Sequence, residues 1–123
     1  MLSKAYLILS WGITALGFLH MAATTRLFAG LTQPALWFFS GGLAMALTGA
    51  LNLLNRPYGG VAPGLSRVCV AANVVITVFA LVAGRAGHAS TVQLLLFVGL
   101  LVLATVLSAL PHSAIASTAS GAP

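Results

Sequence analysis

Among the polar side chains within the long apolar stretches of the sequence, four are the best placed to do chemistry. They are His20, Asn52, Asn73 and Thr77. Because a polar group is costly inside hydrocarbon, such residues mark either a path for a solute or ion or hydrogen bonds between helices. An imidazole at the depth of His20 can carry a proton, ligate haem or a metal, or donate to a neighbouring carbonyl group.

The distribution of histidines argues against a haem or metal centre. A haem held between two spans needs an axial ligand from each of them. Only His20 lies within an apolar stretch, whereas His88 falls in a short polar connection. We therefore predict that the protein holds no metal and no other cofactor, and that His20 makes structural hydrogen bonds or belongs to a proton or solute route.

The missing carboxylates exclude most enzyme classes. The 123 residues contain no Asp or Glu, so side-chain carboxylates cannot form a general acid–base pair, a glycosidase site or a Mg²⁺ site. The single cysteine, Cys69, can form neither an intramolecular disulfide nor a multi-thiolate metal site, and we interpret it as a small buried hydrophobe. The sequence predicts a protein that is not an enzyme.

The elements that must position these residues are set by the composition. Hydrophobic residues make up 60% of the chain and charged residues 4%, whereas soluble domains carry about 25% charged residues. A bilayer is crossed by about 20 apolar residues in a helix, and four stretches have this length, at 5–23, 36–54, 68–84 and 92–110. We expect one transmembrane domain over residues 1–111 and a flexible C-terminal tail over 112–123.

The fold class follows from the solvent. In lipid, only helices satisfy the backbone polar groups within one segment, and the continuous apolar stretches lack the alternation of barrel strands. The residues 55–57 are expected to end the second helix, 58–66 to form a loop, and Ser90 with Gln93 to cap the fourth helix. The prediction is an all-α, four-transmembrane-helix up-and-down bundle.

This topology brings two of the polar residues to the same depth. Asn52 lies about one turn before the end of the second predicted helix, and Asn73 lies one to two turns into the third. Since the two helices are antiparallel, the side chains can bond across the hairpin, contributing about 0.6 kcal/mol. A polar ligand or ion pathway is the alternative role.

Small residues at four-residue spacing follow one face of the second helix. Helices in lipid associate through close van der Waals contact, which such residues permit. Two adjacent rows have this spacing, one of Gly42, Ala46 and Ala50 and the other of Gly41, Met45 and Gly49. This face predicts helix packing, within the chain or against a membrane partner.

The basic residues indicate the environment of the chain and its direction. The five Lys and Arg residues are scattered singly, which favours contact with anionic lipid headgroups over nucleic acid. Lys4, Arg56 and Arg67 fall on one side of the predicted bundle, and Arg26 and Arg85 on the other. By the positive-inside rule we expect a multi-pass protein of the bacterial inner membrane with both termini in the cytoplasm.

The first apolar stretch also imitates a secretory signal peptide. It follows Lys4 and ends in the small residues Ala22 and Ala23. Signal peptides have an apolar region of about 7 to 15 residues, which is shorter than this stretch. We therefore expect the first stretch to remain in the membrane as a span.

A resemblance to known proteins covers the first hairpin. It rests on GFLH at 17–20, ALWFFSGGLA at 35–44 and GALNLLNR at 49–56. In these segments the chain resembles small uncharacterised bacterial four-helix membrane proteins, which implies the fold and no activity. The chain has the length of small multidrug exporters but lacks their membrane-embedded Glu, and it lacks the first-helix and third-helix motifs of fluoride channels.

Two functions are compatible with these observations. The first is a non-enzymatic integral membrane protein that acts by lateral helix association, as a homo-oligomer or as an accessory subunit of another membrane protein. The second is a small-solute or ion channel or transporter lined by His20, Asn52, Asn73 and Thr77. A redox subunit using His20 and His88 has the least support.

Overall fold

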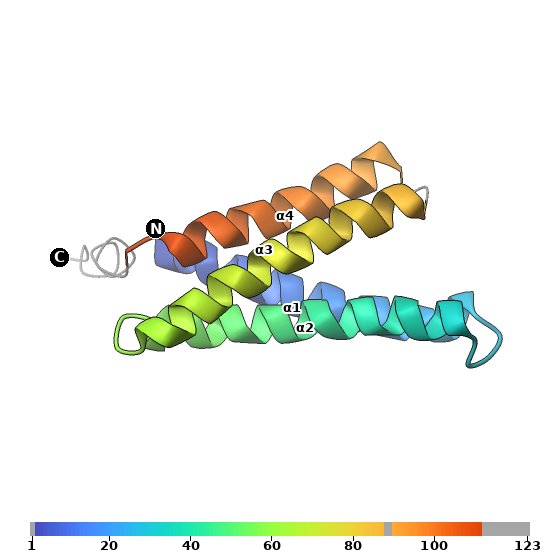
Figure 1. Cartoon of the computed structure of the whole chain (residues 1–123), viewed down its shortest axis with the longest axis horizontal. Helices are drawn as coiled ribbons and strands as arrows, with labels where there is room; N and C mark the ends of the chain where they lie inside the picture. Colours follow the sequence, from blue (N-terminus) through green and yellow to red (C-terminus); the bar gives the residue numbers. More distant parts are fainter. Residues whose placement is uncertain (1, 88–89, 112–123) are drawn as a thin grey trace.

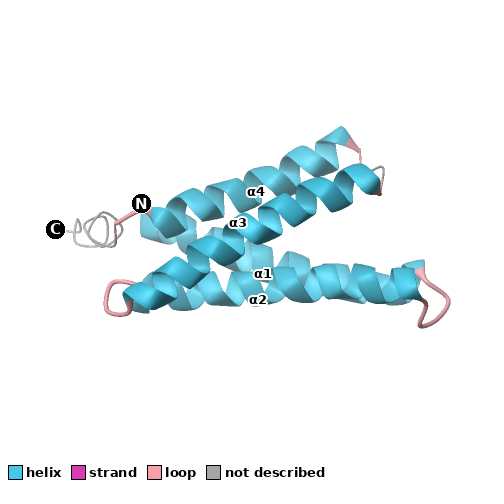
Figure 2. Cartoon of the chain, in the orientation of Figure 1, coloured by secondary structure: helices cyan, strands magenta, loops and turns pink. Residues whose placement is uncertain are grey.

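Four α-helices account for most of the chain in the computed structural model, which describes residues 2–87 and 90–111. They are α1 (Leu2–Leu27), α2 (Gln33–Tyr58), α3 (Pro63–Ala86) and α4 (Thr91–Ala109), and Figure 2 shows helices and loops over the described residues. Each helix is long and apolar enough to cross a membrane. The prediction of an all-α, up-and-down arrangement is confirmed. His88 and the predicted tail at 112–123 lie outside the described residues.

The predicted ends of the helices were wrong around the second loop. Residues 55–57 do not end the second helix, because α2 continues through Pro57 to Tyr58 and the Gly59 N–H donates to the Asn55 carbonyl at 2.8 Å. The loop is therefore limited to residues 59–62. Pro63 begins α3, at a position where its missing N–H breaks no helical bond. At 24 residues α3 is longer than α4, which has 19.

The fourth helix begins as the sequence predicted. The Ser90 side chain accepts from the Gln93 N–H at 3.3 Å, and the Gln93 side chain accepts from the Ser90 N–H at 3.0 Å. This capping box satisfies two N–H groups at the start of α4.

The helices form two hairpins that meet at one end and separate toward the other (Figure 1). α1 packs along α2, and α3 packs along α4. The hairpins meet where α1 and α3 begin and α2 and α4 end. They diverge toward the 28–32 loop and the connection from α3 to α4. The molecule therefore has a closed end and an open end.

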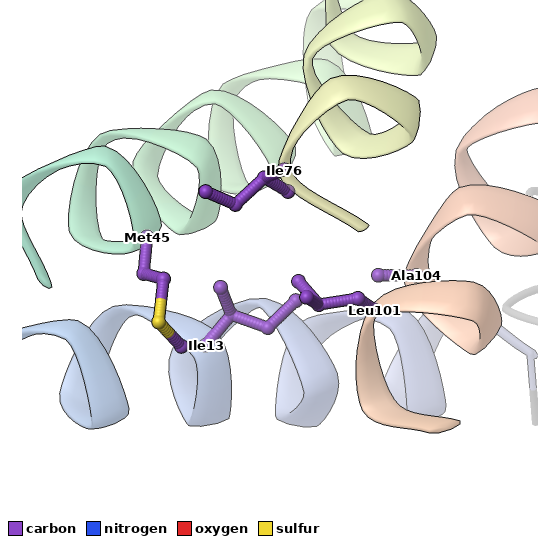
Figure 3. Packing of buried hydrophobic residues seen from close by; sticks show 5 residues of the cluster. All are labelled: Ile13, Met45, Ile76, Leu101 and Ala104. Atoms are coloured by element: carbon purple, nitrogen blue, oxygen red, sulfur yellow. The ribbon is translucent and has the colours of Figure 1, made fainter. Parts of the chain in front are cut away.

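An apolar cluster fills the space between the hairpins. It consists of Ile13, Met45, Ile76, Leu101 and Ala104, which come from all four helices (Figure 3). Each is at most 6% exposed. Because lipid is as apolar as these side chains, their close packing, rather than their removal from water, holds the hairpins together here.

Candidate functional site

Six polar side chains from all four helices form a cluster at the closed end of the bundle. This polar cluster consists of Tyr6 of α1, Asn52 and Asn55 of α2, Cys69 and Asn73 of α3, and Ser108 of α4, and all six residues are 0% exposed. Burial without partners would cost each group several kcal/mol in hydrocarbon. The contacts among them therefore decide whether the cluster is stable.

The Asn52 amide is the centre of the polar cluster. Its Oδ1 accepts from the Tyr6 hydroxyl at 2.8 Å, from the Asn73 Nδ2 at 2.9 Å and from the Cys69 Sγ at 3.3 Å. Its Nδ2 donates to the Asn73 Oδ1 at 2.9 Å and to the Thr48 carbonyl oxygen at 2.8 Å. One side chain of α2 is thereby bonded to both α1 and α3.

The remaining members extend these bonds to the other helices. The Asn55 Nδ2 donates to the Tyr6 hydroxyl at 3.0 Å, which adds a second link between α1 and α2. The Asn73 Nδ2 also lies 3.2 Å from the Ser108 hydroxyl oxygen, to which it donates. The polar cluster thus ties both hairpins together.

The local sequence explains why these residues meet. An up-and-down order places the starts of α1 and α3 beside the ends of α2 and α4. Cys69 and Asn73 are four residues apart and Asn52 and Asn55 are three apart, so each pair shares one face of its helix. Tyr6 and Ser10 have the same relation on α1, and the Ser10 hydroxyl donates to the Tyr6 carbonyl at 2.6 Å.

Sequence reasoning identified Asn52 and Asn73 and overlooked the other members. The structure forms the Asn52–Asn73 pair in both directions. Tyr6 and Ser108 were not predicted to make polar contacts, and Asn55 was expected only to end the second helix. Polar residues at helical spacing near span ends were the signal that could have identified them. Cys69 is buried as expected, but it also donates a hydrogen bond, which an interpretation as a plain hydrophobe omits.

The side chains of the polar cluster are suited to hydrogen bonds between helices and not to a reactive centre. It contains amides, hydroxyls and one thiol, with no charged side chain. Among the described residues, no group of three or more His, Cys, Asp or Glu side chains is arranged to hold a metal. Thr77 does not join the cluster, because its hydroxyl donates to the Asn73 carbonyl of its own helix at 2.6 Å.

His20 lies in a different part of the molecule. Its half-buried ring stacks on Phe38 of α2, with 3.8 Å between ring centroids. A Cβ atom added to Gly41 would lie 3.9 Å from the His20 Nε2 and 3.7 Å from the Phe79 ring. Gly41 of α2 is therefore approached by His20 from α1 and by Phe79 from α3.

The structure does not bring His20 together with the two asparagines. Tyr6, which bonds to Asn52, precedes His20 by 14 residues on α1. At the rise of an α-helix this separation is about 21 Å along the axis. His20, Asn52 and Asn73 therefore do not line one continuous surface, and the bonds of the asparagines are directed to each other and to their neighbours.

The predicted packing residues of α2 are used inside the first hairpin. Gly42, Ala46 and Gly49 are buried and Ala50 is half-buried. A Cβ atom on Gly42 would lie 2.8 Å from the Gly17 carbonyl oxygen of α1, so neither glycine can carry a side chain while the helices stay this close. This face holds α1 and is not available to another molecule.

Comparisons with known proteins do not extend this description. No protein-family model, no curated protein and no solved structure matches the chain.

Proposed function

We propose that this chain is a non-enzymatic protein of the bacterial inner membrane, with both termini in the cytoplasm, that acts by lateral association with a second copy of itself. The four membrane-spanning helices support the membrane part of the proposal. The observation that carries the association is the environment of the His20 ring in the second half of α1.

Within residues 2–87 and 90–111, His20 accepts a hydrogen bond from Thr24 through its backbone carbonyl, and its ring makes a stacking contact with Phe38 rather than a hydrogen bond. It lies six residues before Arg26, or about 9 Å farther into the membrane. A hydrogen bond between membrane helices contributes about 0.6 kcal/mol on average. A partner on a second copy would supply such a bond to the His20 ring.

A second copy can supply that partner. Neutral imidazole has one N–H donor and one nitrogen acceptor, so the His20 ring of one copy can donate an N–H···N bond to the His20 ring of a second copy. Two-fold dimers are also the commonest symmetric assemblies. The small-residue face of α2 is occupied by α1, so the contact between copies uses the surface around His20.

Energy transfer between labelled copies in liposomes tests this proposal. A Gly30→Cys variant provides a labelling site in the 28–32 loop, where an added Cβ meets nothing within 4 Å. We expect transfer between copies that weakens about threefold with His20→Leu, the factor for one average hydrogen bond between membrane helices. His20→Gln, which keeps a donor and an acceptor, should retain it.

Trp11→Leu is the matched control. Trp11 is 58% exposed and precedes His20 by nine residues, which places it on about the opposite face of α1. Its replacement should leave the transfer unchanged. Absence of transfer between wild-type copies at every protein-to-lipid ratio would refute self-association, as would equal losses from Trp11→Leu and His20→Leu.

A further inference from the structure

We propose that the groove between α3 and α4 beside Arg85 binds one anionic glycerophospholipid, with its phosphate at Arg85 and the start of an acyl chain in the groove. This inference is independent of self-association at His20, because it concerns the other hairpin. It rests on the shape and lining of the groove, on the depth of Arg85 and on the charge of the chain.

The groove has one polar end and one apolar end. Its volume is about 400 Å³, and its walls are formed by Leu81, Arg85, Thr91, Leu94, Leu95 and Val98. Arg85 and Thr91 are the polar residues, and both are exposed. The four aliphatic residues lie three to seven positions away from them, or about 4 to 10 Å along the helices. This arrangement matches a headgroup joined to an acyl chain.

Two arginines mark the level of the headgroups. Arg67 and Arg85 lie 18 residues apart on α3, which is five full turns of an α-helix, so they share one face. Their axial separation is about 27 Å, close to the hydrocarbon thickness of about 30 Å. Arg85 therefore lies at one membrane–water interface, with the aliphatic walls of its groove inside the hydrocarbon.

No side chain of this protein can neutralise the charge of Arg85. The sequence has five Lys and Arg residues and no Asp or Glu, so no side-chain carboxylate of this protein, or of a second copy, can pair with the guanidinium. A phosphate accepts two parallel N–H bonds from a guanidinium group. The Thr91 hydroxyl, at the same end of the groove, adds a donor for a phosphate or glycerol oxygen.

A second groove at the other end of α3 provides the comparison. It is lined by Ser66, Arg67, Val70, Ala71 and Ala109. It also pairs an arginine with a hydroxyl, but its apolar walls are one valine and two alanines. These side chains are shorter than the leucines beside Arg85, so they make fewer contacts with successive methylene groups of an acyl chain. We therefore expect this groove to bind a lipid more weakly.

Native mass spectrometry of the full chain tests the proposal. The protein in detergent is titrated with phosphatidylglycerol or with phosphatidylcholine, and the fraction carrying one lipid gives an apparent Kd. We expect tighter binding of phosphatidylglycerol, weakened roughly fivefold by Arg85→Gln, which is the effect of one basic residue near an anionic surface. Arg85→Lys should restore part of the affinity.

Three further titrations distinguish binding in the groove from a general effect of charge. Leu95→Ala keeps every charge and removes an apolar wall, so it should weaken binding of phosphatidylglycerol. Arg67→Gln should have a smaller effect than Arg85→Gln. Inorganic phosphate should not displace the lipid, because it lacks the acyl chain. Unchanged melting of each variant by circular dichroism shows that the fold is retained.

Four results would overturn the proposal. They are equal binding of the two lipids, equal losses from Arg67→Gln and Arg85→Gln, full affinity in Leu95→Ala, and displacement by inorganic phosphate. Equal binding of the two lipids would show that the headgroup charge is not recognised, and equal losses from the two arginine variants would show a non-specific response to charge. The last two results would show an anion contact without a lipid groove.

Discussion

Replacing Asn52 by Leu should release the two hairpins from each other at the closed end. The substitution removes four bonds between helices, namely those from Tyr6, Cys69 and Asn73 to Oδ1 and that from Nδ2 to Asn73. At about 0.6 kcal/mol for an average bond between membrane helices, the loss is about 2.4 kcal/mol. The partners that stay buried without Asn52 add to this cost.

Unfolding in mixed micelles of dodecyl maltoside and dodecyl sulfate measures this loss. Fluorescence of Trp11 and Trp37 reports the transition, because both are on the hairpin that Asn52 bonds to α3. Thr48→Val is the matched control. Thr48 is also buried on α2, one turn before Asn52, but its hydroxyl donates to the Ala44 carbonyl of its own helix. We expect a loss below about 0.6 kcal/mol for this variant.

The comparison also has an outcome that refutes the reasoning. If Asn52→Leu and Thr48→Val lower the free energy of unfolding equally, the polar cluster does not hold the hairpins together. A double variant with Asn73→Leu sharpens the test, because residues that share a bond give non-additive losses. Additive losses from Asn52→Leu and Asn73→Leu would show that the amide pair contributes nothing.

Two further predictions concern the packing of α1 and the thiol of Cys69. Gly49→Ala should destabilise the first hairpin by about 1 to 3 kcal/mol, since its Cβ would lie 2.6 Å from the Thr14 nitrogen. Gly12→Ala, where a Cβ meets nothing within 4 Å, should instead stabilise α1 by about 0.5 to 1 kcal/mol. Denaturant unfolding that gives Gly49→Ala and Gly12→Ala the same free energy of unfolding would contradict this. Cys69, at 0% exposure, should react with a membrane-permeant maleimide only after unfolding, and rapid labelling of the folded protein would show that the polar cluster opens.

The sequence alone determined the solvent, the number of spans and their antiparallel order. These follow from composition and from the length of each apolar stretch, because hydrocarbon admits only backbone that satisfies its own polar groups. The depth of a residue then follows from counting along its helix, and this was sufficient to pair Asn52 with Asn73. Helix ends were less predictable, because the bonds around Pro57 depend on the local path of the chain.

Only the tertiary structure decided which faces of the helices meet. Rotation of a helix about its axis leaves its composition and span length unchanged, and in lipid the apolar faces of Leu and Val are nearly equivalent. The rotation that brings Gly17 against Gly42 assigned the small-residue face to the interior of the first hairpin. The same rotation turned Tyr6 toward Asn52 and placed the His20 ring against Phe38. The small residues of α2 marked a packing face in the sequence, but contacts between side chains far apart in the sequence decide which helix meets that face.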